Sequence, residues 1–350
     1  MNRYKSLFTA LAAVVLGLLA GAVFMALSGS NPVAGFYYLF RGGLMNLERI
    51  GNTLASATTL IFTGLAVAFS FKTGLFNIGA SGQMLMGGLT ATAIGLSVQM
   101  PRLVLLPLIV LAAASAGALW AAIPGFLKAR FNVHEVVATI MMNWIAYWTV
   151  YYTIPAYFKG TFLETESRRI PALASFRAEW LTNIFRGSYI NMGIFLAAAA
   201  VVVIAIILDK TTLGFELKAV GFNRHAAEYA GIHVPKNIVL SMSISGFLAG
   251  LAGATYYLGY AVNMQIGVVP SAGIDGIAVA LLGANSPWGV AASSVFFGIL
   301  HSGKGFMNAM TKVPPEIGDT IIAIITYFAA TGVLFTRLWE RLTRKRSKEA

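Results

Sequence analysis

The chain contains no cysteine and few charged residues. Of its 350 residues, 57% are hydrophobic and 11% are charged, whereas soluble domains carry about 25% charged residues. The lack of cysteine excludes disulfide bonds, thiolate zinc sites and catalysis by a thiol, but it does not identify a compartment. Because so few polar residues cannot cover a globule in water, the composition predicts one membrane domain over residues 1–350 and no separate soluble domain.

Acidic residues are scarce, which leaves a net charge of +12. The basic residues lie at the chain ends and between apolar runs, and they include Arg3, Lys5 and a basic tail at 337–350. Basic flanks beside membrane segments favour the cytoplasmic face and contact anionic lipid headgroups. We therefore expect both termini to be cytoplasmic, membrane lipid to be the partner of these charges, and nucleic acid not to be a partner.

Uncharged runs recur along the whole chain. A spanning helix needs about 20 apolar residues, because the hydrocarbon core of a bilayer is about 30 Å thick. The runs are 7–28, 50–71, 82–101, 103–127, 136–158, 187–208, 237–274, 276–303 and 320–336. The seventh run is too long for one helix, so we expect a span to Tyr260 and then a loop; residues 285–289 form a turn signal that divides the eighth. The pattern predicts an all-α, polytopic membrane protein of about ten segments, some of them broken or partial, with room for inverted-topology repeats.

Signatures of enzyme chemistry are missing from the sequence. Residues 298–304 match the opening of a phosphate-binding loop, but Gly305 stands where that loop needs Ser or Thr to hold magnesium. The 4 histidines lack the spacing of metal ligands, and no nucleophile–base pattern is visible. We therefore expect no enzyme activity, no metal and no cofactor in this chain.

Polar residues at membrane depth are costly in lipid and tend to face protein or water. Asn77 and Gln83 lie in the glycine-rich stretch 74–83, which does not favour a plain helix. Backbone freed from a helix at this depth lines a cavity or is buried in protein. The two amides are therefore expected either to hydrogen-bond a solute or to clamp the broken backbone, and the sequence leaves both roles open.

Three further polar residues are candidates for a solute pathway. Glu135 and Asn143 are eight residues apart, so a helix places them on one face. Glu135 could instead be an interfacial residue near helix N-terminal amides. Asp275 lies with Asn285 on the divided eighth run, and it could instead be a helix cap. Aromatic residues beyond Asn143 are read first as an interfacial belt and second as a stacking platform for a ring.

The polar gap 209–236 separates two apolar runs. Within it, Asn223 is a good helix cap and Gly231 a good helix stop, so a helix of about two turns is expected between them. Its alanines would permit the close approach of a partner. The alternative is a loop that only connects two spans.

Three segments in the same order resemble a known family. They are 76–83 (FNIGASGQ), 134–143 (HEVVATIMMN) and 219–231 (AVGFNRHAAEYAG). They are similar to segments in permease subunits of bacterial ABC importers in the branched-chain amino acid and ribose permease group, and most of all in its nucleoside-importer branch. The resemblance covers the chain from about residue 40 to 335. One departure is Ser81, where relatives commonly carry Glu.

The resemblance implies a multi-pass permease of the bacterial plasma membrane that imports a small polar solute, most simply a nucleoside. It implies an ATPase subunit that binds ATP and magnesium, a second permease subunit in a homodimer or heterodimer, and an extracellular solute-binding lipoprotein. The gap 209–236 would be the cytoplasmic coupling loop against the ATPase, and its predicted contact residues are Gly221, Asn223, Arg224, His225, Ala226, Ala227, Glu228 and Gly231. Alternatives are a permease for a pentose or another simple sugar, and an ion-coupled transporter that works alone.

Overall fold

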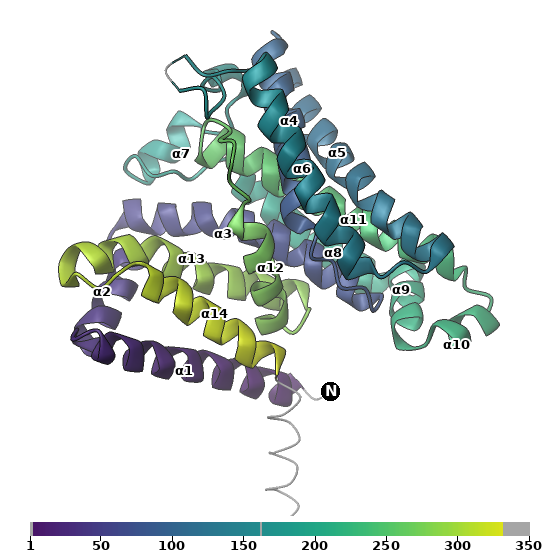
Figure 1. Ribbon diagram of the computed structural model, residues 1–350, viewed down its shortest axis with the longest axis horizontal. Coiled ribbons are helices and arrows are strands. Elements are labelled where there is room, and N and C mark those ends of the chain that lie inside the picture. The colour runs from purple at the N-terminus through teal and green to yellow at the C-terminus, as the bar shows by residue number, and fades with distance from the viewer. Residues whose placement is uncertain (1–2, 162, 332–350) are drawn as a thin grey trace, which may run out of the picture.

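The computed structural model describes residues 3–161 and 163–331, which are helical almost throughout (Figure 1). In these two ranges the only extended pairings are two isolated bridges, Lys159 with Ser167 and Glu166 with Gln265. The predicted all-α class is therefore confirmed. The basic tail predicted at 337–350 lies outside the described residues.

The helices follow the predicted apolar runs closely. They are α1 (Arg3–Leu27), α2 (Pro32–Leu44), α3 (Leu47–Lys72), α4 (Ala80–Ser97), α5 (Arg102–Phe131), α6 (Glu135–Tyr157), α7 (Glu179–Ile184), α8 (Gly193–Lys210), α9 (Thr212–Phe222), α10 (Arg224–Tyr229), α11 (Val234–Thr255), α12 (Ser271–Leu282), α13 (Pro287–Thr311) and α14 (Glu316–Ala330), with a 3-10 turn η1 (Ala172–Ala174) and a π-helical turn η2 (Tyr256–Tyr260). The span predicted to end at Tyr260 does so, through α11 and η2. The eighth run divides between α12 and α13, as the turn signal predicts.

Three helices were not expected from the sequence: α2, α7 and α9. α2 begins after Asn31, whose side-chain oxygen accepts a hydrogen bond from the backbone N–H of Val33 at 2.9 Å, an N-cap that the apolar runs did not indicate. α9 fills the first half of the gap 209–236, where only one helix was expected. α12 also starts five residues earlier than the run at 276, because it begins directly after Pro270.

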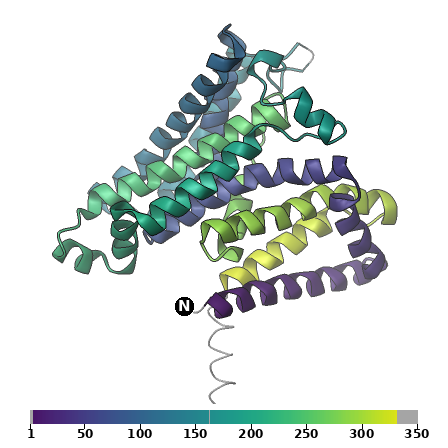
Figure 2. The same ribbon diagram turned by 180° about the vertical axis from the view of Figure 1, so that it is seen from behind.

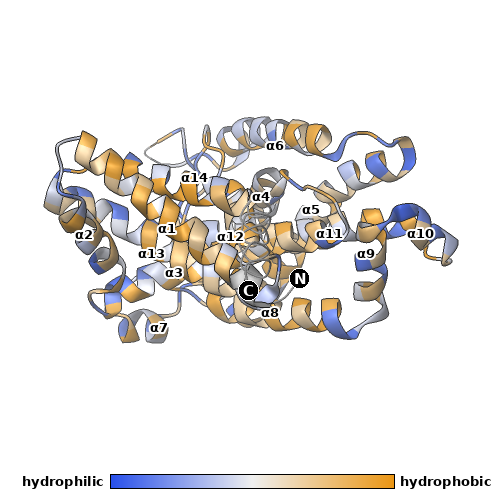
Figure 3. Ribbon diagram, turned by 90° about the horizontal axis from the view of Figure 1, so that it is seen from below, coloured by the Kyte–Doolittle hydropathy of each residue, from blue (hydrophilic) through white to orange (hydrophobic). Residues whose placement is uncertain are grey.

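α3 and α11 form the centre of the fold. Among the described residues, α1, α3, α5, α8 and α11 with η2 are long and apolar enough to cross a membrane. The most apolar stretch of α3 is 83% buried and that of α11 is 72% buried. The corresponding stretch is only 22% buried in α1 and 28% buried in α5 and in α8. α1, α5 and α8 therefore turn apolar residues outward. Figure 3 shows apolar colour along α1 and α8 and hydrophilic residues gathered around α10.

Two groups of helices meet at α3 (Figures 1 and 2). α11 packs against α5, α4 and α3, while α13 packs against α2 and α3, and α1 packs against α14. The contact of α11 with α5 is close because it is built from glycine: a Cβ on Gly246 would lie 2.2 Å from the carbonyl oxygen of Gly117. Small residues let membrane helices approach in this way. The tight pair holds α11, and with it η2, in a fixed position beside α3.

Candidate functional site

The non-helical segment 73–79 joins α3 to α4 inside the protein. Gly74 has a φ of +70°, a conformation that glycine adopts at little cost. Thr73 is fully buried, and its hydroxyl is 2.7 Å from that of Ser241 on α11. The predicted break in the helix is therefore confirmed, and most of the segment packs inside the protein, although Gly74 itself is exposed.

The amides of Asn77 and Gln83 pair with each other. Asn77 Nδ2 donates to Gln83 Oε1, and Gln83 Nε2 donates to Asn77 Oδ1, both at 3.1 Å. Asn77 also donates to Ser245 Oγ at 2.8 Å and accepts from the N–H of Gly79 at 2.9 Å. Both side chains are buried, with 0% and 1% of their surface exposed. Their hydrogen bonds tie the start of α4 to α11.

Asn143 on α6 holds the same segment from the other side. Its Oδ1 accepts from the N–H of Gly82 at 2.8 Å, and its Nδ2 donates to the carbonyl of Ile78 at 3.0 Å. In this conformation Asn77, Gln83 and Asn143 are arranged as a clamp on the broken backbone, the second of the two roles left open by the sequence. Direct contact of these amides with a solute stays a prediction.

The two predicted acidic residues lie apart from this clamp and from each other. Glu135 is the first residue of α6, and its Oε2 is 3.0 Å from Nζ of Lys128 at the end of α5. Asp275 is not a helix cap, because α12 begins four residues earlier, after Pro270. Asn285 lies in the turn beyond the far end of α12, so it forms no cluster with Asp275.

The clamp is connected to α12 through Ser81. The Ser81 hydroxyl donates to the carbonyl of Pro270 at 3.0 Å, and a Cβ on Gly273 would lie 2.3 Å from Ser81 Oγ. Further along α12, a Cβ on Gly276 would lie 2.8 Å from Thr63 on α3. Ser81 therefore contacts the first turn of α12, the helix that carries Asp275.

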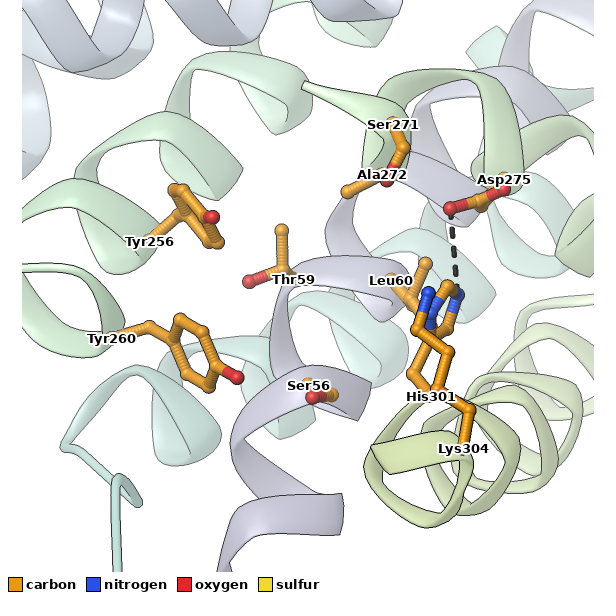
Figure 4. Close-up of a pocket in the computed structure, with 10 residues that line it drawn as sticks. All are labelled: Ser56, Thr59, Leu60, Tyr256, Tyr260, Ser271, Ala272, Asp275, His301 and Lys304. Carbon is orange, nitrogen blue, oxygen red and sulfur yellow. Dashed lines mark ion pairs between the residues drawn. The ribbon is translucent and has the colours of Figure 1, made fainter. Parts of the chain in front are cut away.

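Asp275 lines a cavity of about 200 Å³ between α3, η2, α12 and α13. The residues around it are Ser56, Thr59 and Leu60 from α3, Tyr256 and Tyr260 from η2, Ser271, Ala272 and Asp275 from α12, and His301 and Lys304 from α13. Figure 4 shows the two tyrosines on one side of the space and Asp275 and His301 on the other. Of the five predicted pathway residues, only Asp275 lines this cavity.

Two pairs of ionisable side chains border the cavity. His301 Nε2 is 3.4 Å from Asp275 Oδ2, which is longer than a good hydrogen bond. Lys304 Nζ is 2.6 Å from Asp319 Oδ1 on α14. His301 was not among the predicted site residues, because the 4 histidines of the sequence lack the spacing of metal ligands. The sequence signal that could have identified His301 was a histidine in the same apolar stretch as the acidic residue Asp275.

The predicted coupling loop contains the expected short helix. Asn223 Oδ1 accepts from the N–H groups of His225 and Ala226 at 3.0 and 3.1 Å. The chain turns at Gly231, which has a φ of +84°. The cap, the stop and the helix between them are therefore confirmed. One detail of the prediction is wrong: Ala227 is 3% exposed and faces inward, so Ala226 alone of this adjacent pair is open to a partner.

α9 and α10 present large apolar side chains to the outside. Phe222 is 92% exposed and Tyr229 is 96% exposed, although the surrounding segment is polar. The end of α9 also touches the broken segment, since a Cβ on Gly221 would lie 2.3 Å from the carbonyl of Lys72 and 3.1 Å from the N–H of Gly74. The α9–α10 unit is therefore in direct contact with the segment that Asn77 clamps.

These features define a class of protein: an all-α, multi-pass membrane protein whose broken helices border a cavity with a carboxylate on one side and two tyrosines on the other. Residues 49–330 match the family described as branched-chain amino acid transport system, permease component, and the chain belongs to that family. It is 43% identical to the guanosine ABC transporter permease protein NupP of Bacillus subtilis, over 99% of both chains. It is 39% identical to the nucleoside ABC transporter permease protein NupB of Lactococcus lactis, over 100% of this chain and 97% of that one.

A relative with another solute is also similar along most of its length. The glucose ABC transporter permease protein TsgB13 of Haloferax volcanii is 31% identical, over 93% of this chain and 87% of that one. The family and the apolar helices together make the chain a plasma-membrane permease component of an ABC transporter, rather than an enzyme. The recognition made from the three sequence segments is confirmed.

Proposed function

We propose that this chain is the membrane-spanning subunit of an ATP-driven importer for nucleosides, and that the solute passes the Asp275 cavity. The similarity to a guanosine permease over 99% of both chains carries the choice of solute. The alignment covers 99% of both chains, so it includes the helices that surround the cavity. Asp275 supports the position of the pathway, because a carboxylate at membrane depth is costly unless it faces water, a partner or a solute.

The α9–α10 unit is proposed to dock on the ATPase. Exposed large apolar residues within a polar segment are typical of a surface that a partner covers. A helix as short as α10 is marginal in water on its own and would gain stability from such a partner. The contact residues are those predicted from the sequence, Gly221, Asn223, Arg224, His225, Ala226, Glu228 and Gly231, with Ala227 supporting them from inside. ATP and magnesium would be bound by the ATPase, and no cofactor by this chain.

A contiguous set of contacts leads from this surface to the cavity. Gly221 touches Lys72 and Gly74; the following segment is held by Asn77; and Ser81 then holds Pro270 at the start of α12. We propose that ATPase movement reaches Asp275 along these contacts and alternates access to the cavity. Asn77, Gln83 and Asn143 would act by positioning α4, and Glu135 by fixing the α5–α6 turn through Lys128.

The remaining parts of the assembly follow from the family. We propose a second permease subunit, identical or different, and an extracellular solute-binding lipoprotein that delivers the solute at the end of the bundle opposite α9–α10. Both chain termini are proposed to be cytoplasmic, and residues 1–350 to act as one membrane domain. Basic residues at the ends, among them Arg3, support this orientation.

Uptake of labelled guanosine into cells that express the chain with its partners tests the proposal. We expect uptake that unlabelled nucleosides compete away and that glucose and ribose leave unchanged. Competition by a sugar but by no nucleoside would instead favour the second candidate, a sugar permease, which the 31% identity to the glucose permease supports.

A further inference from the structure

The cavity has two chemically different walls, which deepens the proposed function by pointing to how a solute is recognised. The inference rests on the proposed transport of nucleosides. Tyr256 and Tyr260 form one wall, and Asp275 and His301 form the other, with the hydroxyl of Thr59 between them (Figure 4). No sequence pattern assigned a role to the tyrosines or to the histidine.

The aromatic wall is built on the π-helical turn η2. Tyr256 and Tyr260 are four residues apart, and their rings are stacked with centroids 5.5 Å apart and planes inclined by 20°. π-helical turns are rare and often mark functional sites. Here the turn follows α11 directly and places both rings along one side of the cavity. The wall therefore offers two nearly parallel aromatic groups rather than one isolated ring.

This aromatic wall is held from outside the cavity by Arg177. Its guanidinium donates to the carbonyls of Gly259 and Tyr260, both at 2.7 Å. It also lies 5.1 Å from the ring centroid of Tyr189, whose ring is in turn 5.4 Å from that of Tyr260. Charge-assisted hydrogen bonds are the stronger kind. The rings are therefore preorganised, which lowers the entropy that a solute loses on binding.

The polar wall is a loosely paired carboxylate and imidazole, Asp275 and His301, which contact each other without a well-formed hydrogen bond. Among the described residues, Asp275 Oδ2 and His301 Nε2 are buried atoms that make no hydrogen bond, and the 3.4 Å between them is too long for a good one. Buried polar atoms are nearly always satisfied, so each exception needs an explanation. A carboxylate oxygen can only accept hydrogen bonds. The wall is therefore suited to a ligand that brings hydroxyl donors.

We propose that the cavity is a ribonucleoside subsite in which the base packs on Tyr256 and Tyr260 and the ribose hydroxyls face Asp275 and His301. A flat base has a π face that stacks on aromatic side chains whatever its identity. The 2′- and 3′-hydroxyls donate hydrogen bonds to the Asp275 carboxylate. A ribose hydroxyl also forms a hydrogen bond with His301 Nε2, as donor or acceptor according to the tautomer of the imidazole. A free sugar would satisfy only the polar wall, and a free base only the aromatic wall.

The test compares uptake of guanosine, 2′,3′-dideoxyguanosine and adenosine by the complete transporter, with the same lipoprotein throughout, so that changes between variants report the permease. The wild type should prefer guanosine to its dideoxy analogue by about tenfold or more, the value of hydrogen bonds to a charged group. Asp275→Asn should reduce that ratio to about twofold, because a neutral amide is a weaker acceptor. His301→Gln should reduce it as well, and serves in place of Asp275→Asn if that variant does not reach the membrane.

The aromatic wall is tested with the same substrates. Tyr256→Leu and Tyr260→Leu should each lower guanosine uptake about tenfold per folded molecule, whereas Phe at either position should retain it, because stacking and not the hydroxyl is at work. Tyr152→Leu is the matched control, since this tyrosine is 69% exposed on α6 and is not among the residues that line the cavity.

The possible results of these experiments distinguish a failure of the subsite assignment from a failure of the proposed function. If the wild-type transporter moves no nucleoside, the proposed function fails. If it moves guanosine but the ratio to the dideoxy analogue is unchanged in both polar-wall variants, the ribose assignment is wrong and the proposed function stands. A change in preference between guanosine and adenosine, without loss of the ribose preference, would mean that Asp275 contacts the base edge and would overturn the proposed orientation.

Discussion

Replacement of Asn77 by Ala removes the centre of the clamp on the broken segment. The side chain makes two hydrogen bonds with Gln83, one with Ser245 and one with the N–H of Gly79. A lost hydrogen bond costs about 0.5–1.5 kcal/mol and a buried group left unsatisfied about 1–3 kcal/mol. We expect Asn77→Ala to lower the free energy of unfolding by about 3 kcal/mol, and Gln83→Ala by about 2 kcal/mol.

The two substitutions should be strongly non-additive. Both remove the same pair of hydrogen bonds, so the double variant should cost about 3 kcal/mol rather than the sum, which gives a coupling of about 2 kcal/mol. Unfolding of the purified protein in mixed micelles with rising SDS content measures these values. Asn46→Ala is the matched control: its side chain caps α3 through the N–H of Arg49 at 2.8 Å, which is worth about 1 kcal/mol, and it should add to Gln83→Ala without coupling.

Guanosine transport should depend on the clamp that includes Asn77 and Gln83. Because the clamp positions Ser81 and through it the start of α12, guanosine uptake per folded molecule should fall in both clamp variants and stay normal in Asn46→Ala. Additivity of Asn77→Ala and Gln83→Ala within about 0.5 kcal/mol would refute the clamp. Normal uptake per folded molecule in both variants would refute its connection to transport.

Further predictions concern the partner surface, the outer support of η2, the helix contact and the topology. Ala226→Trp should abolish uptake and solute-stimulated ATP hydrolysis while leaving membrane insertion intact. Ala227→Trp should instead destabilise the protein by about 1–3 kcal/mol through overpacking. If both variants reduced crosslinking to the ATPase equally, the assignment of Ala226 to the outer face and Ala227 to the inner face would be contradicted. Arg177→Gln should lower guanosine uptake severalfold without changing the preference for ribose, since it loosens the aromatic wall and leaves the polar wall in place; a normal rate would show that η2 needs no such support. Gly246→Val should reduce the amount of folded protein, because its Cβ would lie 2.2 Å from a backbone oxygen, and an undiminished yield in the membrane would contradict the close packing. A reporter that is active only outside the cell should be silent when fused after residue 350, and an active fusion would overturn the cytoplasmic C-terminus.

Local sequence signals predicted most of the fold. Uncharged runs placed the long helices, and the signal at 285–289 placed the break between α12 and α13. Asn223 and Gly231 fixed the ends of α10, because caps and left-handed stops act through the backbone of their immediate neighbours. α9 was missed because its sequence has no apolar run long enough to stand out in a polar gap.

The cavity was not predictable in the same way. Asp275 was recognised from its depth in an apolar run, but Tyr256 and Tyr260 on η2 and His301 on α13 come from two elements that only tertiary packing brings together. The sequence drew attention to the aromatic cluster of α6 instead, whose Trp144 is 53% exposed and faces away from the protein. The sequence singled out Asn77, Gln83 and Asn143, but it could not show the hydrogen bonds of Asn143 to Gly82 and Ile78, which depend on the contact of α4 with α6.

The most direct test of the central claim is guanosine transport by the purified complex in proteoliposomes, with and without the ATPase subunit. We expect concentrative uptake that requires ATP, the ATPase and the loaded lipoprotein, and that disappears with Ala226→Trp. Guanosine uptake that persists without the ATPase and follows an imposed proton or sodium gradient would contradict the account and favour an ion-coupled transporter. Uptake of glucose with no uptake of any nucleoside would equally contradict it.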